Sequence, residues 1–216
     1  MKRITLFAGH YGSGKTNIAV NYALYLRSLG NEVEIADLDI VNPYFRTKDS
    51  AEELADAGIE LISPAYANTN VDLPALPQEV YGLVQNTKKY AIMDIGGDER
   101  GALALGRYRP YILEENNFEM VFVANFYRPL TRTAEEAIEV MREIETACGI
   151  PFTAIVNNSN IGEETTAEYV RASFSEVKRL SELTKLPILF TSVKESLLNE
   201  FEGEEILPLR LQNKII

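Results

Sequence analysis

The chain has 216 residues, of which 46% are hydrophobic and 25% are charged, and its formal net charge is −11 at pH 7. These values are typical of a globular protein, and the length suits one domain covering residues 1–216. The negative charge disfavours nucleic acid as a partner, because duplexes need an extended basic surface. No apolar run approaches a membrane span and nothing resembles a signal peptide, so we expect a cytoplasmic protein with no membrane partner.

Cysteine and histidine each occur once, as Cys148 and His10. One chain therefore forms no disulfide, no Cys-x-x-Cys metal pair and no multi-histidine metal site. Cys148 extends the apolar face of the helix expected after residue 133, so we interpret it as a small core residue.

Apolar, β-branched runs alternate with helical patterns along the whole chain. This alternation is typical of an α/β domain, and we predict a mainly parallel sheet of seven to eight strands flanked by helices. The phosphate-loop pattern of Gly9, Gly14, Lys15 and Thr16 adds the prediction of P-loop NTPase architecture. The expected strands cover residues 3–8, 33–37, 59–62, 90–94, 120–124, 153–156, 187–190 and 206–211. The last of these is expected at an edge of the sheet, where Pro208 is tolerated.

The expected helices lie between these strands. They run from a glycine-rich loop to Gly30, from residue 50, over 78–85, from residue 133 to Gly149, and over 164–184 with a break near Ser173. Ser50 with Glu53, and Thr133 with Glu136, have the spacing of capping boxes, so we predict a helix start at each.

The glycine-rich loop between the first strand and the first helix is the clearest motif of the chain. Gly9, Gly14, Lys15 and Thr16 fit the pattern G-x-x-x-x-G-K-[ST]. In this pattern, backbone N–H groups and the helix N-terminus bind phosphates. We therefore expect Lys15 to reach the β- and γ-phosphates and the Thr16 hydroxyl to bind Mg²⁺. The predicted nucleotide-binding residues of the loop are Gly9, His10, Tyr11, Gly12, Ser13, Gly14, Lys15, Thr16 and Asn17.

Further polar segments, residues 37–46 and 94–100, follow two other expected strands. Ligands of parallel sheets bind at the carboxyl ends of the strands, so we expect both segments to meet the loop. Asp94 ends an apolar strand and is a candidate Mg²⁺ ligand. Asp39 is a candidate metal ligand and the candidate catalytic carboxylate, acting with Lys15 by orienting the attacking water. Asp37 and Asp39 either share one face of a strand or are set separately by a turn.

Residues 157–160 read Asn-Asn-Ser-Asn and follow another expected strand. A guanine-specific site usually has Asn-Lys-x-Asp, in which the aspartate binds guanine. The amide of Asn157 is able both to donate to and to accept from adenine. We therefore predict ATP rather than GTP as the nucleotide, with Asn157 near the base.

These motifs occur in the order seen in the MinD/ParA-type P-loop ATPases, and the chain resembles this family, which belongs to the SIMIBI class, over most of its length. The resemblance implies ATP and Mg²⁺ as cofactors and an ATP-dependent sandwich homodimer. It also implies that Thr16 and Asp94 surround Mg²⁺, that Asp39 is the switch I acid, and that Gly96 and Gly97 belong to switch II.

The chain departs from this family at the second residue of the loop. The family has a signature lysine there that reaches the partner's phosphates, whereas this chain has His10, whose imidazole is mostly neutral near pH 7. Arg46 and Arg100 are alternative sources of that charge, although a solvated surface arginine is the simpler interpretation of each. Because Cys148 is a single cysteine, no iron–sulfur cluster is expected. The pattern of residues 204–216 suits a strand rather than a basic membrane-binding helix.

Three functions are consistent with these features. The first is an ATPase that acts as a nucleotide-dependent dimer or partner switch with an unknown protein client. The second is an ATP-dependent small-molecule ligase or kinase, similar to dethiobiotin synthetase, with an acceptor pocket formed by residues 63–77 and 100–109. The third is a nucleotide-binding accessory factor with little turnover. The full set of motifs at the sheet edge favours the first.

Overall fold

A single sheet organises the part of the chain that the computed structural model describes, namely residues 1–39, 47–63, 79–86, 88–97, 99–201 and 205–211. Its strands are β1 (Ile4–Ala8), β2 (Val33–Leu38), β3 (Glu60–Ile62), β4 (Tyr90–Ile95), β5 (Phe118–Ala124), β6 (Ala154–Asn157), β7 (Ile188–Lys194) and β8 (Ile206–Leu209). The α-helices are α1 (Lys15–Ser28), α2 (Ala51–Asp56), α3 (Glu79–Gln85), α4 (Glu99–Gly106), α5 (Arg109–Glu115), α6 (Ala134–Cys148), α7 (Ala167–Ala172) and α8 (Phe174–Thr184). Short 3-10 helices are η1 (Thr47–Ser50), η2 (Gly162–Glu164) and η3 (Glu195–Glu200).

The strand order is β3-β2-β4-β1-β5-β6-β7-β8, and every neighbouring pair is parallel. The prediction of a parallel sheet of seven to eight strands is therefore confirmed. Because all strands run the same way, their carboxyl ends meet at one edge of the sheet. β1 lies between β4 and β5, so the loop that follows β1 has polar segments on both sides.

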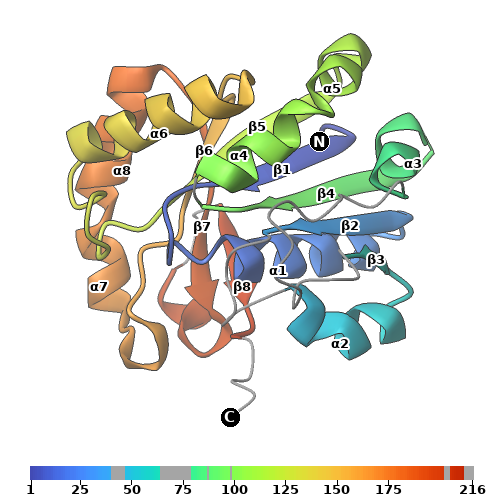
Figure 1. Cartoon of the computed structure of the whole chain (residues 1–216). Helices are drawn as coiled ribbons and strands as arrows, with labels where there is room; N and C mark the ends of the chain where they lie inside the picture. Colours follow the sequence, from blue (N-terminus) through green and yellow to red (C-terminus); the bar gives the residue numbers. More distant parts are fainter. Residues whose placement is uncertain (40–46, 64–78, 87, 98, 202–204, 212–216) are drawn as a thin grey trace, which may run out of the picture.

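Helices cover both faces of the sheet (Figure 1). Along β1 the side chains alternate: Ile4 and Leu6 join the core under α3, α4, α5, α6 and α8, whereas Phe7 joins the core under α1 and α2. This alternation is the consequence of the two-residue repeat of a strand. Both faces of the central strands are therefore apolar, which leaves the strand ends as the place for polar groups.

Most predicted elements are present, with ends shifted by a few residues. β8 lies at an edge of the sheet and contains Pro208, as expected. The helical segment before β7 is broken at Ser173, where α7 ends and α8 begins. At α6 the Thr133 hydroxyl accepts the Glu136 N–H at 3.2 Å, so this helix start is confirmed.

The helix start predicted at Ser50 is confirmed, but the capping box predicted there is wrong. Ser50 precedes α2, but its side chain makes no capping hydrogen bond. The physical reason is that η1 runs directly into α2, so that Ser50 has φ −101° and ψ 15° instead of the extended backbone of a capping residue.

The helices α4 and α5, which fill the interval between β4 and β5, were not predicted from the sequence. Gly101 lies inside α4, and glycine is normally unfavourable in a helix. Here it is required, because a Cβ at Gly101 would lie 2.5 Å from the Cα of Gly96. Arg46, residues 64–77 and the side chain of Arg100 lie outside the described part of the structure. Among the described helices, none has the length and apolar character needed to cross a membrane.

Candidate functional site

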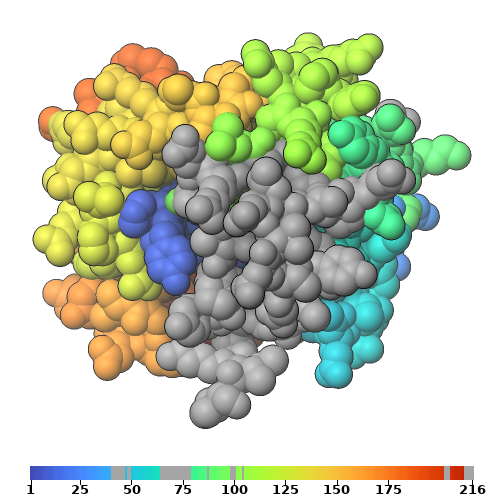
Figure 2. Space-filling view, viewed as in Figure 1, coloured from blue at the N-terminus to red at the C-terminus, as the bar shows by residue number. Residues whose placement is uncertain are grey.

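The phosphate-binding pattern forms a tight loop between β1 and α1. Gly12 and Gly14 have φ of 75° and 86°, in the left-handed region that side chains disfavour. Gly14 also begins α1, and no side chain caps this helix start. The first N–H groups of α1 are the groups that bind an anion in this motif. In Figure 2 part of the N-terminal segment, in blue, reaches the surface beside yellow residues that follow β5 in the sequence.

Lys15 lies at the centre of this loop and is 5% exposed. Its Nζ donates to the carbonyl of His10 at 3.4 Å. A Cβ on Gly97 would lie 2.7 Å from the same Nζ, so the end of β4 passes directly beside the ammonium group. The structure thus brings together the loop lysine and the glycines assigned to switch II.

Asp94 is fully buried at the end of β4. Its Oδ2 accepts the Thr47 hydroxyl at 3.2 Å, while its Oδ1 has no hydrogen-bond partner among the described residues. Burial raises the pKa of this carboxyl to about 6; Lys15 and a hydrogen bond from Thr16 oppose the rise, and the charge of Asp39 adds to it. A buried carboxylate with an unpartnered oxygen is costly unless a cation completes it.

The residues around Asp94 fit a magnesium ion. Mg²⁺ keeps several waters and binds one or two carboxylates together with substrate phosphates. The unpartnered Oδ1 of Asp94 and the adjacent hydroxyl of Thr16 are oxygen donors of this kind. The described residues contain no group of three or more His, Cys, Asp or Glu side chains that would hold a metal by themselves, so phosphate would have to complete the ion's coordination.

Asp37 and Asp39 are both buried beside this site. β2 pairs with β4 as far as Leu38, which places Asp37 opposite Asp94. The N–H of Asp39 then donates to Asp37 Oδ1 at 3.0 Å, so a turn sets Asp39 just past the strand. A Cβ on Gly96 would lie 3.3 Å from Asp39 Oδ1, so this carboxylate also lies against the glycines after β4.

Asn157 lies at the expected edge of the sheet but is completely buried. Its Nδ2 donates to Ser173 Oγ at 2.9 Å, and its Oδ1 accepts the Ser159 N–H at 3.2 Å and the Ser159 hydroxyl at 2.7 Å. Both amide atoms are therefore engaged inside the protein. The contact with adenine stays a prediction, and it would require these bonds to be exchanged.

Two residues that the sequence analysis missed contact the phosphate loop. Asn158 Nδ2 donates to the Ser13 carbonyl at 2.6 Å, and its Oδ1 accepts the Ser192 hydroxyl at 2.5 Å, which ties the loop to β7. Arg128 Nε donates to the Gly12 carbonyl at 2.9 Å. Their position in the sequence could have indicated this role, because both residues follow strands whose carboxyl ends lie at the edge of the sheet that carries the loop.

Thr47 is a third residue that was missed. It is completely buried and belongs to η1, far from the motif in sequence. No sequence pattern indicates its bond to Asp94.

A pocket of about 640 Å³ opens beside the loop, between α4 and α6. His10 and Gly97 form part of its wall. The imidazole Nδ1 of His10 lies 2.9 Å from the carbonyl of Tyr11. His10 of the phosphate loop therefore also lines a cavity that was not predicted from the sequence at this position.

Solved structures with the same fold include proteins of signal recognition. FtsY from Mycoplasma mycoides superposes with a TM-score of 0.57 at 18% identity, over 90% of this chain and 61% of FtsY. The cell division protein FtsY from Thermotoga maritima gives a TM-score of 0.58 at 15% identity, over 90% and 63% of the two chains. The signal recognition particle 54 kDa protein from Aeropyrum pernix, solved in complex with GDP, gives 0.53 at 17% identity, over 88% and 41%.

This likeness defines the class of the fold. The chain has the P-loop NTPase fold of these structures, and it spans about three fifths of the length of the FtsY structures. No protein-family model matches the chain, and no curated protein sequence matches it.

Proposed function

We propose that the protein is a Mg²⁺-dependent ATP-binding protein and an ATPase that acts as a nucleotide-dependent dimer or partner switch. One observation carries the proposal: Lys15 acts on the buried carboxylate of Asp94, whose Oδ1 has no hydrogen-bond partner among the described residues, beside a glycine loop at the start of α1. Such a set of donors and acceptors matches an anion and a cation bound together.

In this proposal each residue has a defined role. Lys15 and the N–H groups at the start of α1 bind the β- and γ-phosphates. Thr16 and Asp94 hold Mg²⁺, which supplies positive charge against the transferring phosphate. A cation beside Asp94 favours its ionised form against the effect of burial, and Asp39, just past β2, orients the attacking water.

The choice of ATP over GTP rests on residues 157–160, which contain no aspartate for guanine. The same choice predicts that wild-type protein binds ATP at least about tenfold more tightly than GTP. Competition between ATP and GTP for a fluorescent nucleotide measures this ratio. Equal affinities, or a preference for GTP, would refute the choice of base while leaving phosphate binding intact.

The dimer or partner switch is supported by exposed apolar side chains beside the loop. Tyr11 is 54% exposed and Leu130 is 62% exposed, and Arg128 anchors the segment of Leu130 to Gly12. A surface of this kind changes its exposure when a second protein covers the nucleotide. The test is to measure the molecular mass of the protein in solution with and without Mg²⁺-ATP, both by itself and mixed with candidate client proteins. If Mg²⁺-ATP changes the mass in neither case, the switch is contradicted.

The experiment that tests nucleotide binding is Lys15→Ala. Loss of a buried, charge-assisted contact predicts that ATP affinity falls about 100-fold or more and that turnover disappears. Lys178→Ala, which changes an exposed lysine on α8, is the matched control and retains wild-type affinity. Wild-type binding by Lys15→Ala would overturn the proposal.

The pocket beside His10 and Gly97 favours a second candidate function, an ATP-dependent small-molecule ligase or kinase. An acceptor bound there would lie next to the phosphate end of the nucleotide. The measurement is ATP loss with and without added acceptor: a switch hydrolyses ATP alone, whereas a ligase or kinase needs the acceptor. Tight binding without turnover in either assay would favour an accessory factor.

A further inference from the structure

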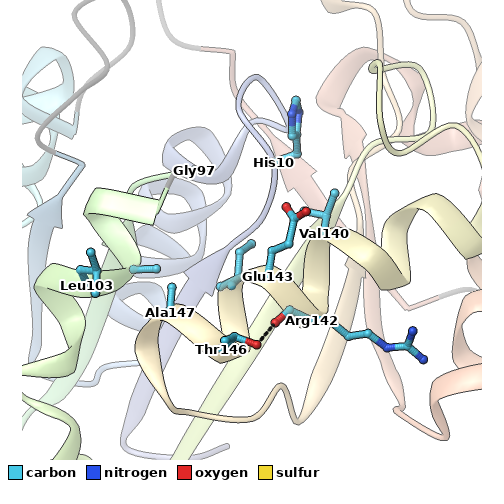
Figure 3. A pocket seen from close by; sticks show the side chains of 10 residues that line it. His10, Gly97, Leu103, Val140, Arg142, Glu143, Thr146 and Ala147 are labelled. Atoms are coloured by element: carbon cyan, nitrogen blue, oxygen red, sulfur yellow. Dashed lines mark hydrogen bonds between the residues drawn. The ribbon is translucent and has the colours of Figure 1, made fainter.

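The pocket between α4 and α6 has the size and lining of a ligand site. Its volume of about 640 Å³ lies within the range of small-molecule sites, about 300–1,000 Å³. Figure 3 shows its two helical walls, with Leu103 on the side of α4 and Val140 and Ala147 on α6. These three side chains give the pocket an apolar interior that suits a carbon skeleton.

The polar groups of the pocket are unevenly placed. In Figure 3 the carboxylate of Glu143 extends toward His10, at the end of the pocket nearest the loop, whereas the guanidinium of Arg142 points away from the other labelled side chains. Glu143 forms no ion pair or hydrogen bond through its side chain with any described residue. A carboxylate beside an apolar wall attracts a cation, and the net charge of −11 adds to this attraction.

The same end of the pocket adjoins Lys15. Gly97 lines the pocket, and a Cβ at this position would lie 2.7 Å from Lys15 Nζ. His10 also lines the pocket, and its carbonyl accepts from that ammonium group. One thickness of backbone therefore separates the pocket from the ammonium group of Lys15, whose positive charge opposes that of a bound cation and weakens its binding.

We propose that this pocket binds a small organic cation in which an ammonium group is attached to an apolar body. The ammonium group lies against Glu143, and the apolar body packs between α4 and α6. The lining, the charge and the volume carry this assignment in the nucleotide-free protein, so it does not depend on the proposed ATPase activity.

The test is calorimetric titration of the full chain with three probes that share one carbon skeleton: n-hexylamine, hexan-1-ol and hexanoate. The titrations are made without nucleotide and without Mg²⁺, so their outcome is separate from that of the Lys15→Ala experiment. We expect hexylamine to bind at least about tenfold more tightly than either other probe, with millimolar affinity or better.

Two pairs of variants locate the binding. Glu143→Gln should abolish the preference for the amine, whereas Glu139→Gln, at an exposed position on α6 outside the pocket, should retain it. Ala147→Trp should fill the pocket and weaken binding of all three probes at least about tenfold. Ala172→Trp, at an exposed alanine of α7, is its control.

Equal affinities for the three probes would overturn the proposal, as would an amine preference that survives in Glu143→Gln. Because Glu143 is exposed, its substitution is not expected to affect folding. This variant therefore decides the question even where Ala147→Trp fails to fold.

Discussion

At the ends of β1, β2 and β4 the buried polar side chains include charged ones, whereas at the ends of β5 and β6 the buried polar side chains are amides and hydroxyls. On the charged side, burial raises the pKa of Asp94, and Asp94 Oδ1 lacks a partner among the described residues. On the neutral side, Asn125, Asn157, Asn158, Ser159 and Asn160 bond to one another and to neighbouring loops.

The two sides therefore serve different purposes, although they share one edge. A satisfied network of neutral groups is stable without a ligand and fixes loop positions. A buried carboxylate with an unpartnered oxygen lowers stability and is retained where a ligand completes it. Asn158 joins the two, because it belongs to the neutral network and donates to Ser13 in the phosphate loop.

The largest effect on ATP affinity is expected for Gly97→Ala, which adds a methyl group next to the charged side chains of the sheet edge. Its Cβ would lie 2.7 Å from Lys15 Nζ, 2.9 Å from the Tyr11 nitrogen and 3.0 Å from the Gly9 carbonyl, so the loop has to shift. We expect ATP affinity to fall about 100-fold, which is about 2.7 kcal/mol.

Nucleotide titration of this variant is compared with that of Gly106→Ala. A Cβ at Gly106, at the end of α4, meets no atom within 4 Å, so affinity should not change there. If Gly97→Ala binds ATP like the wild type, the phosphate site is not as closely packed against β4 as the geometry indicates.

The second prediction concerns how much the buried charge of Asp94 lowers the stability of the nucleotide-free protein, which Asp94→Asn tests. A folded pKa of about 6 against an ordinary 3.8 means that ionised Asp94 opposes folding. The free energy of unfolding of the variant should exceed that of the wild type by about 3 kcal/mol at pH 8. This advantage should shrink as the pH falls through 6, where folded Asp94 becomes protonated, and should vanish below the ordinary pKa of 3.8.

Urea denaturation in EDTA without nucleotide, from pH 4 to pH 8, measures this effect. The same variant should lose Mg²⁺-dependent nucleotide binding, since it removes the carboxylate proposed to hold the ion. A variant that is less stable than the wild type at pH 8 would show that Asp94 contributes to the apo fold rather than opposing it.

The third prediction tests the neutral side through Asn157→Ala. Removal of a buried amide with three bonds should lower the free energy of unfolding by about 1 to 2 kcal/mol. If Asn157 is only structural, the ratio of ATP to GTP affinity stays unchanged; if it binds the base, this ratio falls. Ser175→Ala, at an exposed serine of α8, is the control for stability.

The smallest effect is expected far from both sides, for Gly82→Ala in α3. A Cβ at Gly82 meets no atom within 4 Å, and the residue lies inside a helix. Alanine should therefore raise the free energy of unfolding by about 0.5 to 1 kcal/mol without changing nucleotide binding. Thermal unfolding with and without ATP checks both statements, and a loss of stability would mean that α3 is packed more tightly at Gly82 than the structure shows.

The sequence by itself determined the features that depend on short stretches of chain. The alternation of strands and helices, the loop from Gly9 to Thr16, the cap at Thr133 and the break at Ser173 follow from periodicity and hydrogen bonds within a few residues. The helix start at Ser50 was also predicted correctly, but the capping box there was wrong, because η1 precedes α2 and changes the backbone at the helix start. The helix α4 was missed, because Gly101 disfavours a helix and is required here only by the close approach of Gly96.

Only the tertiary structure decided which distant residues meet. Strand order places Asp37 opposite Asp94, brings Thr47 to the same carboxylate and attaches Asn158 to the phosphate loop. It also forms the pocket beside His10 from two helices that are far apart in the sequence. These contacts depend on packing across many intervening residues, which local sequence patterns do not encode.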